Sequence, residues 1–354
     1  GSEMCIRDRN DLIRDLSALA GFSQRRALQV AGVSRGTWHA RHHHGRDVAA
    51  AVSPVPQRER EQPARLSASV CARVAGFISA GRTGGLGVAG AFAKAWDEGF
   101  MEASLRSWWR IAARVRREQA TVEQATVEQS GAAGERAVAR VKPQVLATGA
   151  NQVWAWDITD LPTAFRGVAF KAYAIIDIFS RKVIVASVHQ RESTADAMAL
   201  FMAAIAAEGG CVPQVVHADN GAVMRSNLLN EFLTEHGIEV SHSRPRVSND
   251  NPYIESEFRT LKNRASYPGV FASLVEASTY VAQHVHWYNH AHHHSGIALY
   301  TPAQVHDGSW KMLHARRQVS LAYYQARHPE RFRGHRAPVP APKAWAGINH
   351  PGPE

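Results

Sequence analysis

The fold is decided by NQVWAWDITDLP at residues 151–162, an apolar run of strand-like composition that carries the carboxylate of Asp157. A second apolar run, VVHADNG at 215–221, ends on Asp219, and a helical pattern further on, PYIESEFRTLK, carries Glu255. A lone carboxylate is costly to bury, so acids in such runs need a partner. Three hard oxygen ligands from separate elements suit Mg²⁺, which binds few carboxylates and keeps positions for water and substrate phosphates.

The order of the expected elements predicts a mixed α/β sheet. Strands are expected at 151–160, 166–176 and 181–189, then a helix at 193–208, a strand ending at Asp219, a helix at 226–236, a strand at 238–242 and a helix from about Pro252. Three strands in hairpin succession, followed by strands that alternate with helices, is the order of an RNase H-like fold. We therefore expect an RNase H-like catalytic core in which helices flank a mixed five-stranded sheet.

Six ordered motifs resemble those of the DDE transposases and retroviral integrases, specifically the bacterial insertion-sequence transposases of the IS-three type. They are NQVWAWDITDLP (151–162), YAIIDIFSRKVIV (173–185), VVHADNG (215–221), SRPRVSNDNPYIESEFRTLK (243–262), WYNHAHHHSGIALYTP (287–302) and HPERF (328–332). Together they cover roughly residues 142–333, and so many ordered motifs make a chance match improbable.

The resemblance implies a role for each acidic residue. Asp157, Asp219 and Glu255 are expected to be catalytic and to hold two Mg²⁺ ions, with Mn²⁺ able to substitute; Asp157 would bridge both ions. Lys262 matches the basic residue that related transposases place against the terminal phosphate of the element. An ordinary surface lysine is the alternative at that position.

Further DNA contacts are expected around the helix that carries Glu255. Arg259 and Lys262 follow Glu255 by four and seven residues, which puts them on the same helical face. The polar, basic loop before the helix has a composition suited to touching substrate DNA, and its expected DNA-binding residues are Arg244, Arg246 and Asn251.

Other polar residues of this region are weaker candidates. Asp160 is expected to brace a loop, and Asp177 to bond Ser180 or Arg181 in a turn. His217 either reaches the site from the same sheet face or is a core histidine. The histidines between 284 and 294 lack a cysteine partner, and no metal is assigned to them.

The spacing of residues 10–43 predicts a helix-turn-helix motif. A tight turn at Gly32-Val33-Ser34 separates two helices, and the second is expected to present Arg35, Thr37, Trp38 and Arg41 to DNA. An ordinary helical hairpin is the alternative interpretation.

A second helical DNA-binding module is expected at residues 66–118. Its last helix carries a cationic stripe spaced for one face, made of Arg106, Arg110, Arg114 and Arg117. This stripe predicts contact with the DNA backbone, and a solvated surface is the alternative.

The composition of the remaining segments predicts where the other domains, linkers and tails begin and end. Residues 1–9 read as a non-native or disordered tail, 44–65 as a linker and 119–141 as a connector. The core is expected over 142–310, a helical extension over 311–335 and a disordered tail, rich in Pro, Ala and Gly, over 336–354.

Composition and charge narrow the class of protein. The chain has 354 residues and a net charge of +10, and residues 1–149 hold 22 basic and 14 acidic side chains, a net of +8. This excess suits a half that grips DNA phosphates while the other half performs chemistry. Three scattered cysteines indicate no disulfide framework, and without a membrane span or signal peptide we expect the protein in the cytoplasm, at the nucleoid.

The sequence therefore predicts an insertion-sequence transposase, a polynucleotidyl transferase that binds the inverted-repeat ends of its element and a target duplex. Two ends must be held together, so a homo-oligomer on DNA is expected. The alternatives are a retroelement-type integrase, a catalytically silent DNA-binding regulator and an RNase H-like nuclease. The recognised end sequence, the target, the stoichiometry and whether the chain is one part of a frameshift fusion do not follow from the residues.

Overall fold

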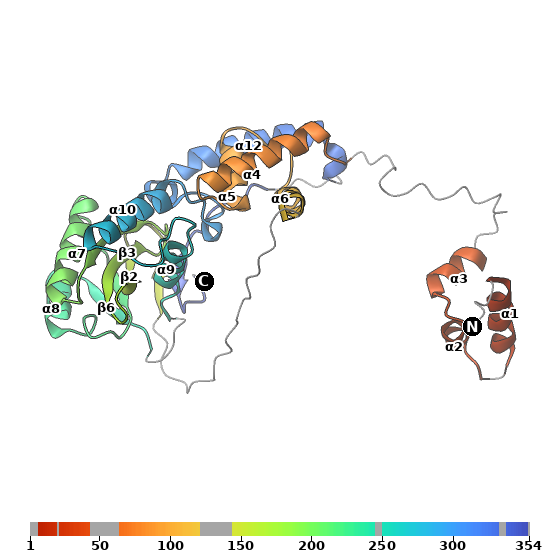
Figure 1. The fold of residues 1–354 in the computed structure, drawn as a ribbon, viewed down its shortest axis with the longest axis horizontal. Helices are drawn as coiled ribbons and strands as arrows, with labels where there is room; N and C mark the ends of the chain where they lie inside the picture. The colour runs from red at the N-terminus through yellow and green to blue at the C-terminus, as the bar shows by residue number, and fades with distance from the viewer. Residues whose placement is uncertain are drawn as a thin grey trace. The chain divides into compact units, whose positions relative to one another are not determined.

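The computed structural model describes residues 6–19, 21–42, 64–120, 144–244, 250–332 and 338–352 (Figure 1). The chain divides into two compact units, Gly1–Gln62 and Pro63–Glu354. The expected linker over 44–65 and connector over 119–141 lie almost entirely outside the described residues.

The first unit is a bundle of three helices, α1 (Ile6–Ala18), α2 (Gln24–Val30) and α3 (Arg35–His42). Serine caps start the last two: Ser23 Oγ accepts from the backbone N–H of Arg26, and Ser34 Oγ accepts from that of Thr37. Trp38 packs in the core of this unit with Ile13, Ala27 and Leu28. The expectation that Trp38 is presented to DNA is therefore wrong, because the small unit uses its largest side chain as core.

The second unit begins with α4 (Ala68–Thr83), α5 (Val88–Asp97) and α6 (Leu105–Ala120). The apolar faces of these helices share one core with α12 (Trp310–Arg327), in which Trp108 is 1% exposed and contacts Phe92 edge to face. The helical module and the C-terminal helix are thus one packing unit, although about 190 residues separate them in sequence.

A five-stranded sheet follows, with the strand order β4-β3-β2-β5-β6. Strands β2, β3 and β4 pair antiparallel, and β5 and β6 add in parallel, which confirms the predicted mixed sheet. The strands are β2 (Val153–Pro162), β3 (Ala169–Asp177), β4 (Val183–His189), β5 (Val215–Ala218) and β6 (Glu239–His242). The helices around them are α7 (Thr194–Ala207), α8 (Asn227–Glu235), α9 (Pro252–Lys262), α10 (Leu274–His290) and α11 (Pro302–Asp307), with short 3-10 turns at Ser295–Ile297 and Pro329–Arg331.

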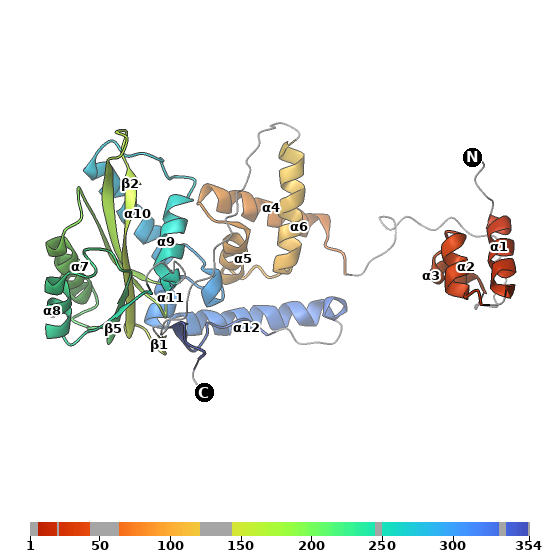
Figure 2. The same cartoon turned by 90° about the horizontal axis from the view of Figure 1, so that it is seen from below.

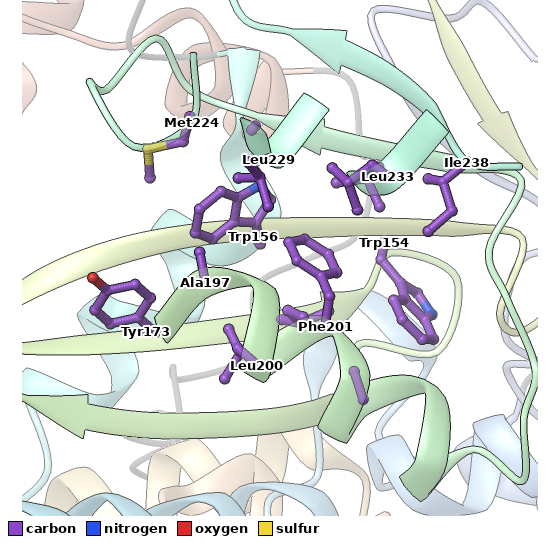
Figure 3. Packing of buried hydrophobic residues seen from close by; sticks show 14 of the residues in the cluster. Trp154, Trp156, Tyr173, Ala197, Leu200, Phe201, Met224, Leu229, Leu233 and Ile238 are labelled. Atoms are coloured by element: carbon purple, nitrogen blue, oxygen red, sulfur yellow. The ribbon is translucent and has the colours of Figure 1, made fainter. Parts of the chain in front are cut away.

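Alternation along β2 assigns its side chains to two faces of the sheet. Trp154 and Trp156 point to the face covered by α7 and α8, where Trp156 meets Phe201 edge to face at 5.4 Å between ring centroids (Figure 3). Val153 and Ala155 point to the opposite face, which α9 and α10 cover (Figure 2). An odd-numbered residue that continues this strand therefore faces α9.

The tail forms structure that composition did not predict. Residues 346–348 form β7 (Ala346–Ile348), which pairs antiparallel with β1 (Val145–Ala147) and buries Ile348 to 1% exposure. The expected disorder over 336–354 is therefore wrong for residues 338–352. Composition alone misleads here because a three-residue strand needs only a partner edge and a few apolar contacts, and β1 supplies both.

The helical module is held to the core by a buried ion pair between Arg317 of α12 and Asp97 of α5. Arg317 is 2% exposed and donates to both Asp97 oxygens, at 2.6 and 2.9 Å. Its guanidinium also donates to the carbonyls of Ala298 and Leu299, two consecutive residues with positive φ, 58° and 61°. Left-handed backbone is unfavourable for such residues, so the hydrogen bonds from Arg317 help to hold a strained turn.

We predict that Asp97→Ala destabilises the folded protein by about 3 kcal/mol, because it leaves the buried Arg317 guanidinium without its counter-ion. The control is Glu98→Ala, which removes an exposed neighbouring carboxylate and is expected to change the free energy of unfolding by less than about 0.5 kcal/mol. Urea unfolding of both variants measures the difference. Equal unfolding midpoints for Asp97→Ala and the wild type would show that the ion pair does not hold the module.

Candidate active site

Strand register places Asp157 and Asp219 side by side. Strands β2 and β5 run parallel with Trp156 opposite Ala218, and each carboxylate is the next residue along its strand. Both are odd-numbered continuations of strands whose residues 153, 155 and 215 pack toward α9. The two side chains therefore share one face of the sheet at the carboxyl end of β5.

Glu255 is brought to the same face by α9. Ile254 and Phe258 of this helix are buried against the sheet, in a cluster with Val153 and Ala155. Glu255, between them in sequence, is partly buried. The helix begins at Pro252, whose fixed φ suits a first turn.

The three carboxylates lie near enough for their charges to interact. Burial, together with the nearby charges of Asp219 and Glu255, raises the pKa of Asp157 to about 7, against a hydrogen bond from the Ile158 backbone N–H at 2.7 Å. Burial and Asp219 also raise the pKa of Glu255, while Arg259 opposes that rise. The site thus holds more negative charge than its surroundings neutralise.

The donor set suits a hard divalent cation, because all three side chains offer carboxylate oxygens. Within the described residues, no group of three or more His, Cys, Asp or Glu side chains is already close enough to hold a metal ion. The carboxylates would therefore have to move toward a cation that binds between them.

Lys262 and Arg259 extend the site along α9. The Lys262 ammonium donates to Thr159 Oγ1 at 2.7 Å, and Thr159 lies two residues beyond Asp157 on the same face of β2. Arg259 is exposed, one helical turn after Glu255. Arg259 thus lies one turn from Glu255, and Lys262 is bonded to a residue two positions from Asp157; their contact with DNA stays a prediction.

The loop before α9 differs from expectation. Arg244 donates to both oxygens of Asp250, at 2.8 and 2.9 Å, and its guanidinium holds the pKa of that carboxyl far below its usual value. Asn251 is 1% exposed and donates to the backbone carbonyl of Trp156 at 3.3 Å. Its expected DNA contact is therefore wrong: it ties the start of α9 to the strand residue before Asp157. Arg246 lies outside the described residues.

The other expected DNA-binding residues lie on exposed helix faces. Arg35 and Thr37 are exposed on α3, where Thr37 also bonds the Ser34 hydroxyl, while the side chain of Arg41 lies outside the described residues. The four arginines of the α6 stripe, Arg106, Arg110, Arg114 and Arg117, are all exposed. Their contact with DNA stays a prediction.

The remaining polar residues of this region have partners within the protein. Asp177 is fully buried and accepts from the backbone N–H and hydroxyl of Ser180, which confirms its expected role in a turn. Asp160 pairs with Lys171 across the strands at 2.6 Å. His217 is a core histidine, because it is fully buried and bonded to serines on β6 and just after it, and burial lowers its pKa to about 4.

Sequence reasoning missed the contact between α9 and α10. His284 Nε2 lies 2.8 Å from Glu257 Oε1, and both side chains are buried. Glu257 is two residues from Glu255, so this bond helps to fix the helix that carries Glu255. The signal in the sequence was weak, because a histidine and a glutamate 27 residues apart have no spacing to connect them.

Comparison with known proteins agrees with this geometry. Residues 147–248 match the protein-family model described as Integrase core domain, and residues 236–302 match a second model with the same description. The chain is 31% identical over 157 residues to the transposase for insertion sequence element IS904 of Lactococcus lactis subsp. lactis (strain IL1403), covering 44% of this chain and 61% of that protein. It is 29% identical over 157 residues to the InsK protein of insertion sequence element IS150 of Escherichia coli (strain K12), covering 43% and 55%.

Solved structures of integrase cores are also similar to the chain. The catalytic core domain of HTLV-2 integrase in complex with magnesium is 19% identical, with a TM-score of 0.33, and the match covers 45% of this chain and 97% of that one. The catalytic core domain of BIV integrase is 18% identical, with a TM-score of 0.35, covering 46% and 97%.

The matched region therefore carries an integrase core domain with an RNase H-like fold, and the similarity to insertion-sequence transposases is confirmed. The chain spans between about half and three fifths of the length of these transposase relatives. None of the helices in the described parts of the chain has an apolar stretch that could cross a bilayer.

We predict that Asp157→Asn stabilises the protein without divalent metal at pH 7, by about 1 kcal/mol or more. The folded state holds a proton on Asp157 up to about pH 7, whereas the unfolded chain releases it near 3.8, so the wild type loses stability as the pH rises through this interval. The amide carries no charge, and its advantage should vanish near pH 4. Thermal melts in EDTA at pH 4 and 7 measure it, and a lower Tm for the variant at pH 7 would contradict this electrostatic cause.

Proposed function

We propose that the chain is a DDE transposase of an insertion sequence, which cuts DNA at the ends of its element and joins the freed 3′-OH to another phosphodiester. The observation that carries this proposal is the placement of Asp157, Asp219 and Glu255 on one face of the sheet, inside an integrase core domain. The charge of Asp219 contributes to the raised pKa of both Asp157 and Glu255, which supports action on the same small volume.

The site residues fit a divalent cofactor, Mg²⁺ with Mn²⁺ as a substitute. When bound, two such ions supply charge that activates the attacking oxygen and stabilises the leaving oxygen of an in-line displacement. Asp157, Asp219 and Glu255 are the residues that would hold these ions. The excess negative charge of the carboxylate set favours cation binding and keeps free phosphate away until a cation neutralises it.

The chemistry needs no covalent bond to the protein. Attack of a water oxygen on phosphorus breaks the bond to the 3′ oxygen, and that 3′-OH then attacks a second phosphodiester, so each step breaks one P–O bond and forms one. The chain's part is to position the phosphates. Lys262 is the cation best placed for this, because its ammonium lies beside Thr159, two residues along β2 from Asp157.

We infer that double-stranded DNA is the partner, as inverted-repeat ends and as target. The exposed Arg35 and Thr37 of α3 and the arginine stripe of α6 offer phosphate contacts outside the core. Two element ends must react together, so a homo-oligomer assembled on DNA is expected. Such a protein would act in the cytoplasm, at the nucleoid.

The first test is a strand-transfer assay with purified protein, Mg²⁺ or Mn²⁺ and a labelled duplex from the inverted repeat of the element. The wild type should give joined products, and both Glu255→Gln and Asp219→Asn should abolish nicking and joining while DNA binding persists, because each removes a ligand charge. Glu235→Gln, an acid at the end of α8, is the matched control and should keep activity. Joining by Asp219→Asn at the wild-type rate would refute the site, and specific binding without any reaction by the wild type would favour a regulator.

Lys262→Ala should reduce end cleavage about tenfold or more, because a charge-assisted hydrogen bond to phosphate is lost. The exposed Lys311 of α12 provides the control, since Lys311→Ala removes the same charge far along the chain. Cleavage rates under single turnover, together with a thermal melt, separate a site defect from a folding defect. Unchanged cleavage by Lys262→Ala would remove this lysine from the site.

A further inference from the structure

A pocket of about 660 Å³ lies between the helical module and the integrase core. One wall is the loop from Arg82 to Gly87, which joins α4 to α5, and the other is the end of α9 with the residues that follow it, together with Trp287 and His292. This volume is that of a small-molecule site and would hold a nucleotide.

The pocket is strongly cationic. Its lining includes three arginines, Arg82, Arg259 and Arg264, and no carboxylate. Burial lowers the pKa of His292 to about 4, so at neutral pH this ring adds no charge. The guanidinium groups therefore set the chemistry, and their planar forks match phosphate oxygens in pairs.

The arginine at the centre is held in place by the two walls together. Arg264 lies over the ring of Trp287, 4.2 Å from its centroid, and the Trp287 indole N–H donates to the Gly84 carbonyl at 3.3 Å. Gly85 has a φ of 73°, a conformation that favours glycine, and a side chain there would extend toward Trp287 and Arg264. The loop thus contacts the core without filling the pocket. Because the Trp287 ring packs against Arg264, it supports this arginine and does not offer a stacking surface for a base.

The pocket adjoins the catalytic carboxylates. Arg259 lines it and follows Glu255 by one helical turn on α9. A turn advances about 5.4 Å, close to the step between neighbouring phosphates along a strand. A strand whose scissile phosphate lies at Glu255 would therefore bring an adjoining phosphate to Arg259 and the next into the pocket.

We propose that this Arg82–Arg264 pocket grips the sugar-phosphate backbone of the DNA strand that adjoins the bond to be cut. The proposal rests on the proposed function, because it takes the three carboxylates as the site of cleavage. It assigns to the helical module a direct share in holding the reacting strand, in addition to any contact made by the α6 stripe.

The test replaces single phosphates of a labelled element-end duplex with neutral methylphosphonates and measures binding by anisotropy in EDTA, where no cleavage is needed. In the wild type, one or two positions near the cleaved bond should weaken binding about three- to tenfold. Arg82→Gln and Arg264→Gln should weaken binding of the unmodified duplex by a similar factor. In these variants the same methylphosphonates should have little further effect, because the arginine that contacts the phosphate is already gone. Arg264→Lys should keep the salt dependence but not the full affinity, since it retains the charge without the fork.

Lys311→Gln is the matched control and should leave the methylphosphonate profile intact. Two results would overturn the proposal. In the first, Arg82→Gln and Arg264→Gln bind the duplex as tightly as Lys311→Gln. In the second, they bind more weakly but keep the methylphosphonate profile of the wild type, which would mean that the arginines act only through long-range charge. Failure of the proposed function is seen separately, as wild-type protein that binds the duplex with a normal profile and yet never joins ends with metal. Arg82 is exposed, so its variant keeps the test valid should Arg264→Gln unfold, which a thermal melt would reveal.

Discussion

The ion pair between Arg317 and Asp97 is the constraint on which the arrangement of the second unit depends. A guanidinium that is 2% exposed cannot exist there without its carboxylate, and Asp97 is the last residue of α5. The same guanidinium lies 4.1 Å from the ring centroid of Tyr300 and bonds the strained turn before it. One side chain of α12 therefore fixes the helical module, the turn after α10 and, through α5, the loop that closes on Trp287.

The active site is built on the opposite principle. Around it, acidic side chains have partners: Arg244 forms an ion pair with Asp250, and His284 forms a hydrogen bond with Glu257 inside the protein. Among the described residues, the carboxylates of the proposed site have no such partners: burial and the charge of Asp219 raise the pKa of both Asp157 and Glu255, and a cation would balance this charge. The paired side chains stabilise the structure around the site, whereas the three carboxylates do not stabilise the fold. This is common where a site must bind charge.

The sequence predicted the sheet and its acids well, because both are local patterns. The apolar run that carries Asp157 and the one that ends at Asp219 predict strands, and the alternation of side chains along them puts both acids on one face. Pro252 indicates the start of the helix that carries Glu255. The parts that failed are those in which distant segments meet. The sequence around Asn251 does not indicate that its side chain donates a hydrogen bond to the Trp156 carbonyl. The composition around Ile348 does not predict a strand, because the partner strand begins some 200 residues earlier. The pocket between Arg82 and Arg264 was equally invisible, because it exists only where two walls from different segments meet.

The pairing of β7 with β1 has a consequence for the order in which the protein matures during synthesis. Tyr253, in the first turn of α9, donates to the Gly347 carbonyl at 2.8 Å, and Asn349 donates to Asp250 just before that helix. A ribosome that has translated as far as α12 has made the whole five-stranded sheet and all three carboxylates. It has not yet made Gly347 and Asn349, which hold the start of the Glu255 helix in addition to the bond from Asn251 to Trp156. Because such distant contacts form late, a nascent chain would carry all three acids before the helix that holds Glu255 has made these contacts.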